Sequence, residues 1–346
     1  MAPGTWLAPV DNDEAVAGKL VQRLAYDEQR RQSWRSELRE KLRELMGLPE
    51  PDGSELNVRT LWEEEDELGS ITKLVFTSEE RADVPCYFCV PGAAVAPFTT
   101  VICLQGHTSG MHNSIGRAFD DERRRIEVPG DRDFAMSAMR HGFAALCIEQ
   151  RGFGERVDSP REGGSATWGC HDPAMRALLL GRTLLGERVF DVDRAIDYLE
   201  SRGDIATVGL VGNSGGGTVS IYAAALLERV AFAMPSCSFA TFKGSIFAIH
   251  HCVDNFLPGI LRWAECADVL GLFAPKPVVV VAGRDDDIFP LASVTAAYRQ
   301  LERIYADAGA GNACALVVGE GGHRFYAEEG WGKMMELLTQ VGLSVS

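Results

Sequence analysis

Short apolar segments rich in valine and leucine alternate with helical patterns through the second half of this chain. The segments are FAALCIEQ, VGLVGN, FAMPS, PVVVVAG and ALVVGEG, and helical patterns lie over 187–202, from 215, from 291 and at the C-terminus. A strand buried on both faces has a continuous apolar run, whereas a half-exposed strand alternates. The alternation therefore predicts an α/β fold with a mostly parallel central sheet and helices on both faces.

The segment from 56 to 104 favours further strands, in NVRTLW, SITKLVF, CYFCV and TTVICLQG. The acidic run WEEEDE at 62–67 is interpreted as a solvated turn between two of them. Two stretches interrupt the later alternation: 152–185 is rich in glycine and charge, and 240–273 in aromatic and small residues. Long excursions in a compact α/β domain are typical of lids or binding loops.

The first part of the chain has a helical period instead. Apolar residues recur every three or four positions through 11–47, which predicts two helices or one bent helix, with a break near DEQRRQS. We therefore divide the chain into an N-terminal helical arm, 1–50, and a main domain, 51–346, with excursions at 152–185 and 240–273. The arm either packs on the main domain or forms a contact between copies in a homo-oligomer.

Composition narrows the classes of partner. The chain has 346 residues, 34 Lys and Arg against 49 Asp and Glu, and hence a net charge of −15. Such a surface repels nucleic-acid backbones and anionic lipid, so neither nucleic acid nor a membrane is an expected partner. The chain lacks an apolar run of about 18 residues and a basic, apolar leader, which favours a cytoplasmic protein.

One segment carries a clear chemical signal. In VGLVGNSGGGTVSIYAAALL an apolar strand ends in Gly212-Asn213-Ser214-Gly215-Gly216, and an Ala-rich helix follows at once. This G-x-S-x-G arrangement between strand and helix is typical of a nucleophilic serine, because the sharp turn exposes the central side chain and requires small flanking residues. Ser214 would lie at a helix N-terminus, which favours developing negative charge.

A serine nucleophile needs a histidine base and a carboxylate to orient that base. PVVVVAGRDDDIFP places Asp285, Asp286 and Asp287 directly after a buried strand, and ALVVGEGGHRF places His323 in a Gly-rich turn after the next one. Carboxyl ends of parallel strands meet at one edge of a sheet, so these groups are expected to converge on Ser214. The order Ser, Asp, His is the one found in α/β-hydrolases.

From about residue 85 to its end the chain resembles the α/β-hydrolase superfamily, and its motifs are similar to the acetyl xylan esterase and dienelactone hydrolase-like branch, near the prolyl oligopeptidase catalytic domain. The resemblance implies the α/β-hydrolase fold. It also favours Asp286 as the triad acid, since the family pattern G-x-x-D-x-x-x-P matches Gly283 to Pro290. Asp285 stays the alternative, because a one-residue difference in turn geometry is not decided by sequence.

The resemblance also implies an oxyanion hole and a bracing arginine. The two N–H donors of the oxyanion hole would be Gly215 and either His107 or Thr108 in LQGHTSG. In this segment Gln105 replaces the family's histidine. IEQRGFGER is similar to the family segment whose arginine braces active-site loops through a buried ion pair, here Arg151.

No cofactor or metal is expected from the sequence. His107 and His112 have no carboxylate at ligand spacing beside them. A second group consists of His250, His251, Cys252 and Asp254, but adjacent histidines point in different directions on a helix.

The expected activity is that of a carboxylic ester hydrolase that uses Ser214, His323 and Asp286 and forms an acyl-enzyme. Its substrate would be a small-molecule ester, either short-chain or acetyl, carbohydrate esters included. A lactone hydrolase and a peptidase or amidase of the prolyl oligopeptidase-like group are the enzyme alternatives. A catalytically silent binding protein is the alternative from another class, and it predicts a broken triad.

Overall fold

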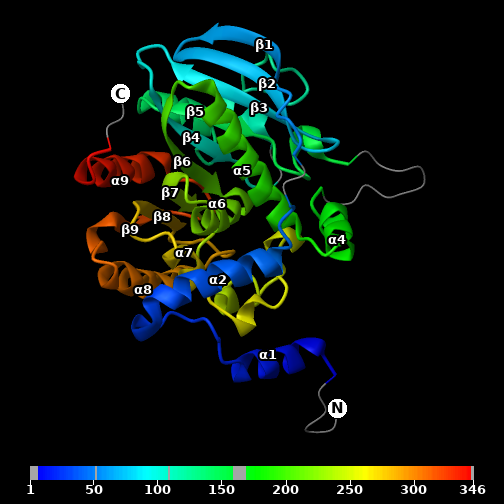
Figure 1. Cartoon of the computed structure of the whole chain (residues 1–346), viewed down its shortest axis with the longest axis vertical. Helices are drawn as coiled ribbons and strands as arrows, with labels where there is room; N and C mark the ends of the chain where they lie inside the picture. Colours follow the sequence, from blue (N-terminus) through cyan, green and yellow to red (C-terminus); the bar gives the residue numbers. More distant parts are fainter. Residues whose placement is uncertain (1–6, 51–52, 108–109, 159–168, 344–346) are drawn as a thin grey trace.

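The structure is a computed structural model of the chain, and it describes residues 7–50, 53–107, 110–158 and 169–343. Its centre is a nine-stranded sheet with the order β1-β2-β3-β5-β4-β6-β7-β8-β9 (Figure 1). The strands β1, β2, β3 and β5 pair antiparallel, and the strands from β5 through β4 to β9 pair parallel. The bounds are β1 Arg59–Asp66, β2 Gly69–Glu79, β3 Ala82–Pro91, β4 Phe98–Leu104, β5 Ala144–Ile148, β6 Ile205–Asn213, β7 Val230–Ser236, β8 Val278–Gly283 and β9 Cys314–Gly319.

Both faces of this sheet are buried, as the apolar runs predicted. In β8, Val278 and Val280 face one apolar core, and Val279 and Val281 face the other. The first core includes residues of α2 (Arg31–Met46), α5 (Leu184–Arg202), α6 (Gly215–Leu226), α7 (Cys266–Gly271) and α8 (Leu291–Asp307). The second includes residues of α3 (Phe134–Arg140) and α9 (Ala327–Gln340). The prediction of a mostly parallel sheet with helices on both faces is confirmed.

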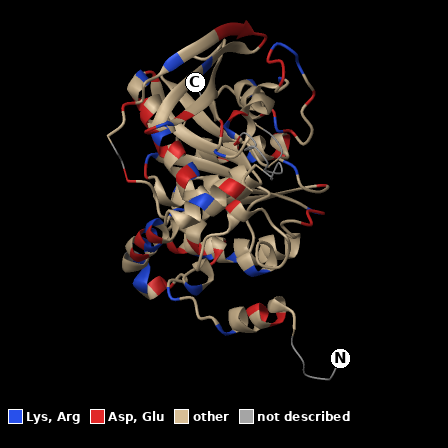
Figure 2. Ribbon diagram, turned by 90° about the vertical axis from the view of Figure 1, so that its right-hand side faces the viewer, with Lys and Arg blue, Asp and Glu red and all other residues tan. Residues whose placement is uncertain are grey.

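The interpretation of WEEEDE as a turn is wrong. Residues 62–66 belong to β1, with Glu64 paired to Ile71 and Asp66 to Gly69 of β2, and the turn begins at Glu67. Edge strands tolerate charge because one side and one face meet water. Asp66 also forms ion pairs with Arg117 and Arg125. Figure 2 shows the acidic end of this strand in red at the top of the molecule.

The N-terminal residues form two helices, α1 (Pro9–Lys19) and α2. The apolar side of α2 is fully buried, with Leu38, Leu42 and Met46 at 0% exposure, whereas Val16 of α1 is 51% exposed. Helix α1 ends well before the predicted break. Leu24 instead donates its backbone N–H to Trp263 O at 2.8 Å, an extended contact that a continued helix would lose.

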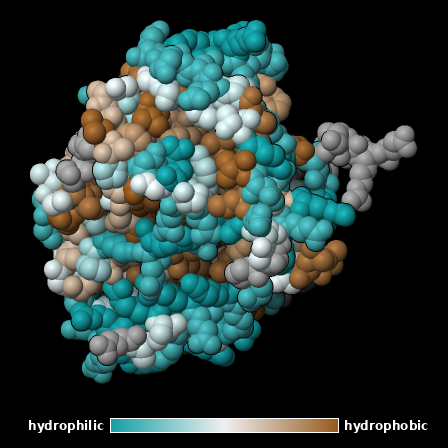
Figure 3. All heavy atoms as spheres, turned by 45° about the horizontal axis from the view of Figure 1, so that its top comes forward, coloured by the Kyte–Doolittle hydropathy of each residue, from teal (hydrophilic) through white to brown (hydrophobic). Residues whose placement is uncertain are grey.

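The two excursions lie beside each other. The first contains α4 (His171–Leu179), and its residues 159–168 fall outside the described part of the chain; the second contains short 3-10 turns and α7. Helix α4 contacts the 3-10 turn Val253–Asn255. The end of α4 exposes leucines, with Leu179 at 88%, and Figure 3 shows an apolar patch below the grey segment on that side. In the described residues, every helix is too short or too polar to cross a bilayer.

Candidate active site

Ser214 occupies the turn between β6 and α6, where it is the N-cap residue of the helix. Its φ of 55° and ψ of −122° lie in a region that side chains other than glycine rarely adopt. Such a conformation costs roughly 1–3 kcal/mol and persists only when the surroundings enforce it. Two backbone hydrogen bonds do so: Ser214 N–H donates to Ser236 O, and Thr218 N–H donates to Ser214 O, both at 2.9 Å.

The glycines around Ser214 allow close packing of this turn. A Cβ on Gly216 would lie 2.0 Å from Leu104 O, and one on Gly212 would lie 2.4 Å from Gly216 O. A Cβ on Gly106 would lie 3.0 Å from the Ser214 Cβ. The N-terminus of α6 therefore sits directly against the carboxyl end of β4, which brings the loop after β4 beside Ser214.

The acid and the base of the predicted triad are in contact. His323 Nδ1 donates to Asp286 Oδ2 at 2.8 Å, and the Asp286 side chain is fully buried whereas that of His323 is 22% exposed. The other oxygen, Asp286 Oδ1, accepts the backbone N–H groups of Ile288 and Phe289 at 2.9 and 3.1 Å. The neighbouring acids Asp285 and Asp287 are exposed, so only Asp286 of the three is buried against the imidazole.

The same contacts set the charge of Asp286. Burial alone would raise the pKa of this carboxyl, but the hydrogen bond and charge of His323 and the N–H of Phe289 outweigh it and hold the pKa below its usual value. Asp286 is thus a carboxylate at neutral pH. A carboxylate at Nδ1 fixes the orientation and tautomer of the ring, which leaves Nε2 of His323 to exchange a proton.

Ser236, at the end of β7, links the serine turn to the histidine loop. Its backbone carbonyl accepts the N–H of Ser214, and its hydroxyl donates to Arg324 O and Phe325 O at 3.2 and 3.3 Å. The strands β6, β7, β8 and β9 are adjacent and parallel. Ser214, Asp286 and His323 therefore lie at the same edge of the sheet.

The loop after β4 places His107 against Gly215. A Cβ on Gly215 would lie 2.8 Å from Cε1 of His107, so the imidazole covers the start of α6. Nε2 of His107 donates to Asp254 Oδ1 at 2.8 Å. Burial lowers the pKa of His107, but the bonds to Asp254 and Cys170 prevail and raise it to about 9. Thr108, the alternative oxyanion donor, lies outside the described residues.

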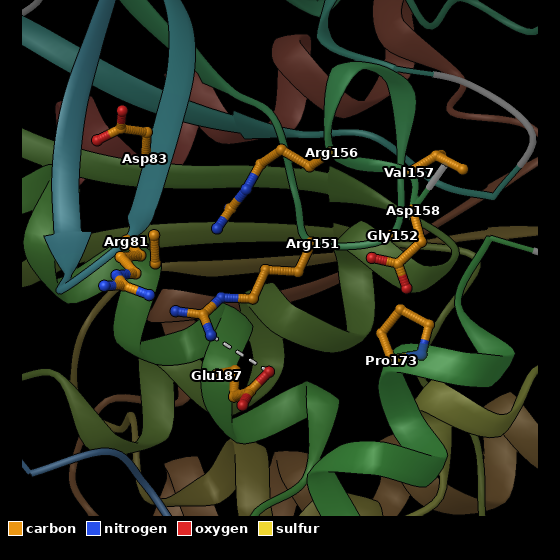
Figure 4. A pocket seen from close by; sticks show the side chains of 10 residues that line it. Arg81, Asp83, Arg151, Gly152, Arg156, Val157, Asp158, Pro173 and Glu187 are labelled. Atoms are coloured by element: carbon orange, nitrogen blue, oxygen red, sulfur yellow. Dashed lines mark ion pairs between the residues drawn. The ribbon is translucent and has the colours of Figure 1, made fainter. Parts of the chain in front are cut away.

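Arg151 is the centre of a buried ion-pair network. Its guanidinium bonds Asp191 through Nε and Nη2 at 3.0 and 2.9 Å, Glu79 at 2.7 Å and Glu187 at 3.2 Å. Burial raises the pKa of Asp191, but Arg156 and Arg151 more than offset this and lower it to about 2. Figure 4 shows Arg151, Arg156 and Glu187 lining a pocket of about 420 Å³, which is not lined by Ser214, Asp286 or His323.

Arg151 also reaches the loop after β4 through its backbone. Its carbonyl accepts Nε and Nη2 of Arg188 at 3.0 and 2.6 Å, and Nη1 of Arg188 contacts Asp254 Oδ2. Asp254 in turn holds His107. Three contacts thus connect the expected bracing arginine to the expected oxyanion loop, through four separate segments of the chain.

Sequence reasoning missed Glu149, and it considered His251 without placing it beside the proposed acid and base. Glu149 is buried and accepts the backbone N–H groups of Met111 and Glu155 at 3.1 and 3.2 Å, and burial raises its pKa to about 7. The ring of His251 packs edge-on against Phe289, which stacks on His323. Burial and the neighbouring charge of His107 lower the pKa of His251 to about 4. The sequence signal for Glu149 is only that it directly follows the apolar run FAALCI.

Together, the nine-stranded sheet, the serine at the strand-to-helix turn and the Asp–His pair at the same edge define an α/β-hydrolase. The chain belongs to the Abhydrolase family, whose profile matches residues 15–219. A Bacillus subtilis (strain 168) protein named as the hydrolase YtaP is 25% identical to this chain over 294 residues. The match covers 84% of this chain and 94% of that protein.

Solved structures share the fold. A Bacteroides fragilis NCTC 9343 protein described as an acetyl xylan esterase matches with a TM-score of 0.74 and 14% identity, over 92% of this chain and 84% of that one. A glucuronoyl esterase from Solibacter usitatus matches with a TM-score of 0.66 and 16% identity, over 93% of this chain and 98% of that one. At such identity the likeness shows the common fold of the chains.

Proposed function

We propose that this protein is a carboxylic ester hydrolase in which Ser214, His323 and Asp286 act as a catalytic triad. The observation that carries the proposal is the strained serine at the start of α6, on the same sheet edge as the buried Asp286–His323 pair. Acyl transfer requires a base that activates the hydroxyl and a carboxylate that orients the base, and this arrangement supports both roles.

In the proposed reaction, Oγ of Ser214 attacks the ester carbonyl while Nε2 of His323 accepts the proton of the serine hydroxyl. The proton then passes to the departing alcohol, and an acyl-enzyme forms on Ser214. Water, deprotonated by His323, attacks the acyl carbon and releases the acid and the free serine. Asp286 stays ionised and stabilises the imidazolium in both steps.

The oxyanion of each tetrahedral intermediate would be bound by the backbone N–H groups of Gly215 and His107. Gly215 is the first residue of α6, and N–H groups of a first helical turn have no partner within the helix. The His107 ring lies against Gly215, which keeps the two backbone segments adjacent. One such donor typically contributes about 100-fold to 1,000-fold in kcat.

For the substrate, we propose a short-chain or acetyl ester of a carbohydrate. The names of the structural neighbours support this class, because they describe an acetyl xylan esterase and glucuronoyl esterases. Acetylated xylo-oligosaccharides, a methyl ester of glucuronic acid and a simple lactone would be compared at equal concentration. The proposal expects the highest kcat/KM with the acetylated sugar; a preference for the lactone would contradict it.

The reaction itself is tested with p-nitrophenyl esters from acetyl to octanoyl. Ser214→Ala should lower kcat by at least about 1,000-fold, as loss of a triad serine does. Ser36→Ala, on the exposed side of α2, is the matched control and should leave kcat unchanged. Equal rates for the wild type and Ser214→Ala would contradict the proposed function.

A further inference from the structure

A second cluster of reactive side chains lies beside the proposed triad, where three segments of the chain meet. The loop after β4 contributes His107, the start of α4 contributes Cys170, and the second excursion contributes Cys252 and Asp254. One nitrogen, two sulfur and one oxygen atom of these residues all lie within 4.8 Å of one another. The proposed hydrolysis uses none of these four side chains as a reacting group.

The kinds of atoms in the cluster select a particular metal. Two thiolates, an imidazole and a carboxylate suit Zn²⁺, whereas Mg²⁺ and Ca²⁺ require oxygen ligands. Zinc bonds of about 2.3 Å to sulfur and about 2.0 Å to nitrogen or oxygen place tetrahedral ligands roughly 3.3–3.8 Å apart. The observed separations, all below 4.8 Å, are close to those distances.

Charge in the cluster also fits a divalent cation. Two thiolates and one carboxylate carry three negative charges, which a Zn²⁺ ion would reduce to one. Arg188 supplies the remaining positive charge, since its guanidinium contacts Asp254 Oδ2 and its side chain is 1% exposed. Buried charge is tolerated when it is balanced in this way.

Arg188 also orients the carboxylate. The guanidinium is fixed by two hydrogen bonds to Arg151 O and lies 4.3 Å from the centroid of the Phe153 ring. The guanidinium contacts Oδ2 of Asp254, and the other carboxylate oxygen, Oδ1, faces His107 Nε2. Groups that hold a ligand in this manner are a regular part of metal sites.

We propose that His107, Cys170, Cys252 and Asp254 form a zinc-binding site that ties both excursions to the loop after β4. Four protein ligands leave no open position, so the ion is structural and not a catalyst. On binding, the two thiols and His107 Nε2 release their protons to solvent, and no electron is transferred. Cys252 and His107 are partly exposed, which gives the ion a path of entry. This proposal departs from the expectation of no metal, because sequence separates Cys170 from its partners.

The test uses the full chain, purified with a thiol reductant, freed of metal and titrated with Zn²⁺ or with Co²⁺ as a coloured substitute. The proposal expects one ion per chain and a thiolate-to-cobalt charge-transfer absorption. Cys252→Ser should weaken binding by more than about tenfold. Cys314→Ser, which alters a buried thiol elsewhere, should leave binding unchanged.

A second measurement needs no variant. In the wild type, Zn²⁺ should protect Cys170 and Cys252 from alkylation by iodoacetamide, as read by peptide mass spectrometry. Failure of the reduced wild type to bind either ion would overturn the proposal, and so would unchanged binding by a folded Cys252→Ser protein. A Cys170–Cys252 disulfide found in protein prepared with Zn²⁺ would also overturn it. Ester hydrolysis is not part of any of these measurements, so they succeed or fail independently of the proposed function.

Discussion

Nδ1 of His323 lies 2.8 Å from Oδ2 of Asp286, although the two residues belong to loops that follow different strands. The contact is buried on the aspartate side, and Asp285 next to it is exposed. Asp285 and Asp286 are therefore neighbouring aspartates, of which one is exposed and the other buried against His323. This difference allows the proposed acid to be tested with a substitution of the same kind at each position.

Asp286→Asn should lower kcat by about 10,000-fold, because an amide no longer holds the imidazole in the required tautomer. Asp285→Asn is the matched control and should change kcat by less than about threefold, since surface substitutions have small effects. Steady-state hydrolysis of p-nitrophenyl acetate measures both. Equal losses in the two variants would show that Asp286 is not the triad acid.

Gly216→Ala tests the close packing beneath Ser214. The added Cβ would lie 2.0 Å from Leu104 O, a backbone atom that cannot move alone, so we expect a loss of at least about 2 kcal/mol in unfolding free energy. Gly332→Ala in α9 meets nothing within 4 Å and should gain up to about 1 kcal/mol. Urea unfolding measures both, and similar stabilities would contradict the packing described here.

Arg151→Met should destabilise the protein by about 3–5 kcal/mol, because Glu79, Glu187 and Asp191 would stay buried without the guanidinium that they share. Arg30→Met removes an exposed ion pair with Glu37 and should cost less than about 1 kcal/mol. The comparison is made by urea unfolding at neutral pH. A small effect at both positions would mean that the Arg151 network contributes little to stability.

Glu149 predicts a particular pH dependence. Burial raises its pKa from 4.5 to about 7 in the folded protein, so the carboxyl favours folding while protonated. That contribution is complete below pH 4.5 and is lost as the pH rises through about 7, by on the order of 3 kcal/mol. Urea unfolding at pH 5 and pH 8 should show a larger drop for the wild type than for Glu149→Gln. Identical drops would contradict the raised pKa.

The sequence predicted the sheet well because burial on two faces leaves a continuous apolar run. Each of the nine strands falls on a segment with that pattern or with strand alternation, and the valines of β8 divide between the two cores as such a run requires. The second half of β1 was interpreted as a turn, because charged residues on an exposed strand resemble those of a turn. The predicted first helix was longer than α1, because the helical period of apolar residues continues to Leu24, which instead hydrogen-bonds to the backbone of Trp263.

The triad candidates were found because each follows a strand that ends at the same sheet edge. The rest of the site depends on contacts between distant segments, which no local pattern encodes. Asp254 meets His107 from 147 positions away, and Arg188 meets Asp254 from 66 positions away. Their pairing depends on the path of the excursion at 240–273, and that segment has no periodicity from which its path can be derived.

Covalent trapping tests directly whether Ser214 is the nucleophile. A p-nitrophenyl alkylphosphonate would be incubated with the wild type and with Ser214→Ala, and the adduct located by peptide mass spectrometry. We expect one phosphonyl group per wild-type chain, on Ser214, with release of one equivalent of p-nitrophenol, and no adduct in the variant. An adduct on another residue, or equal labelling of both proteins, would contradict this role of Ser214.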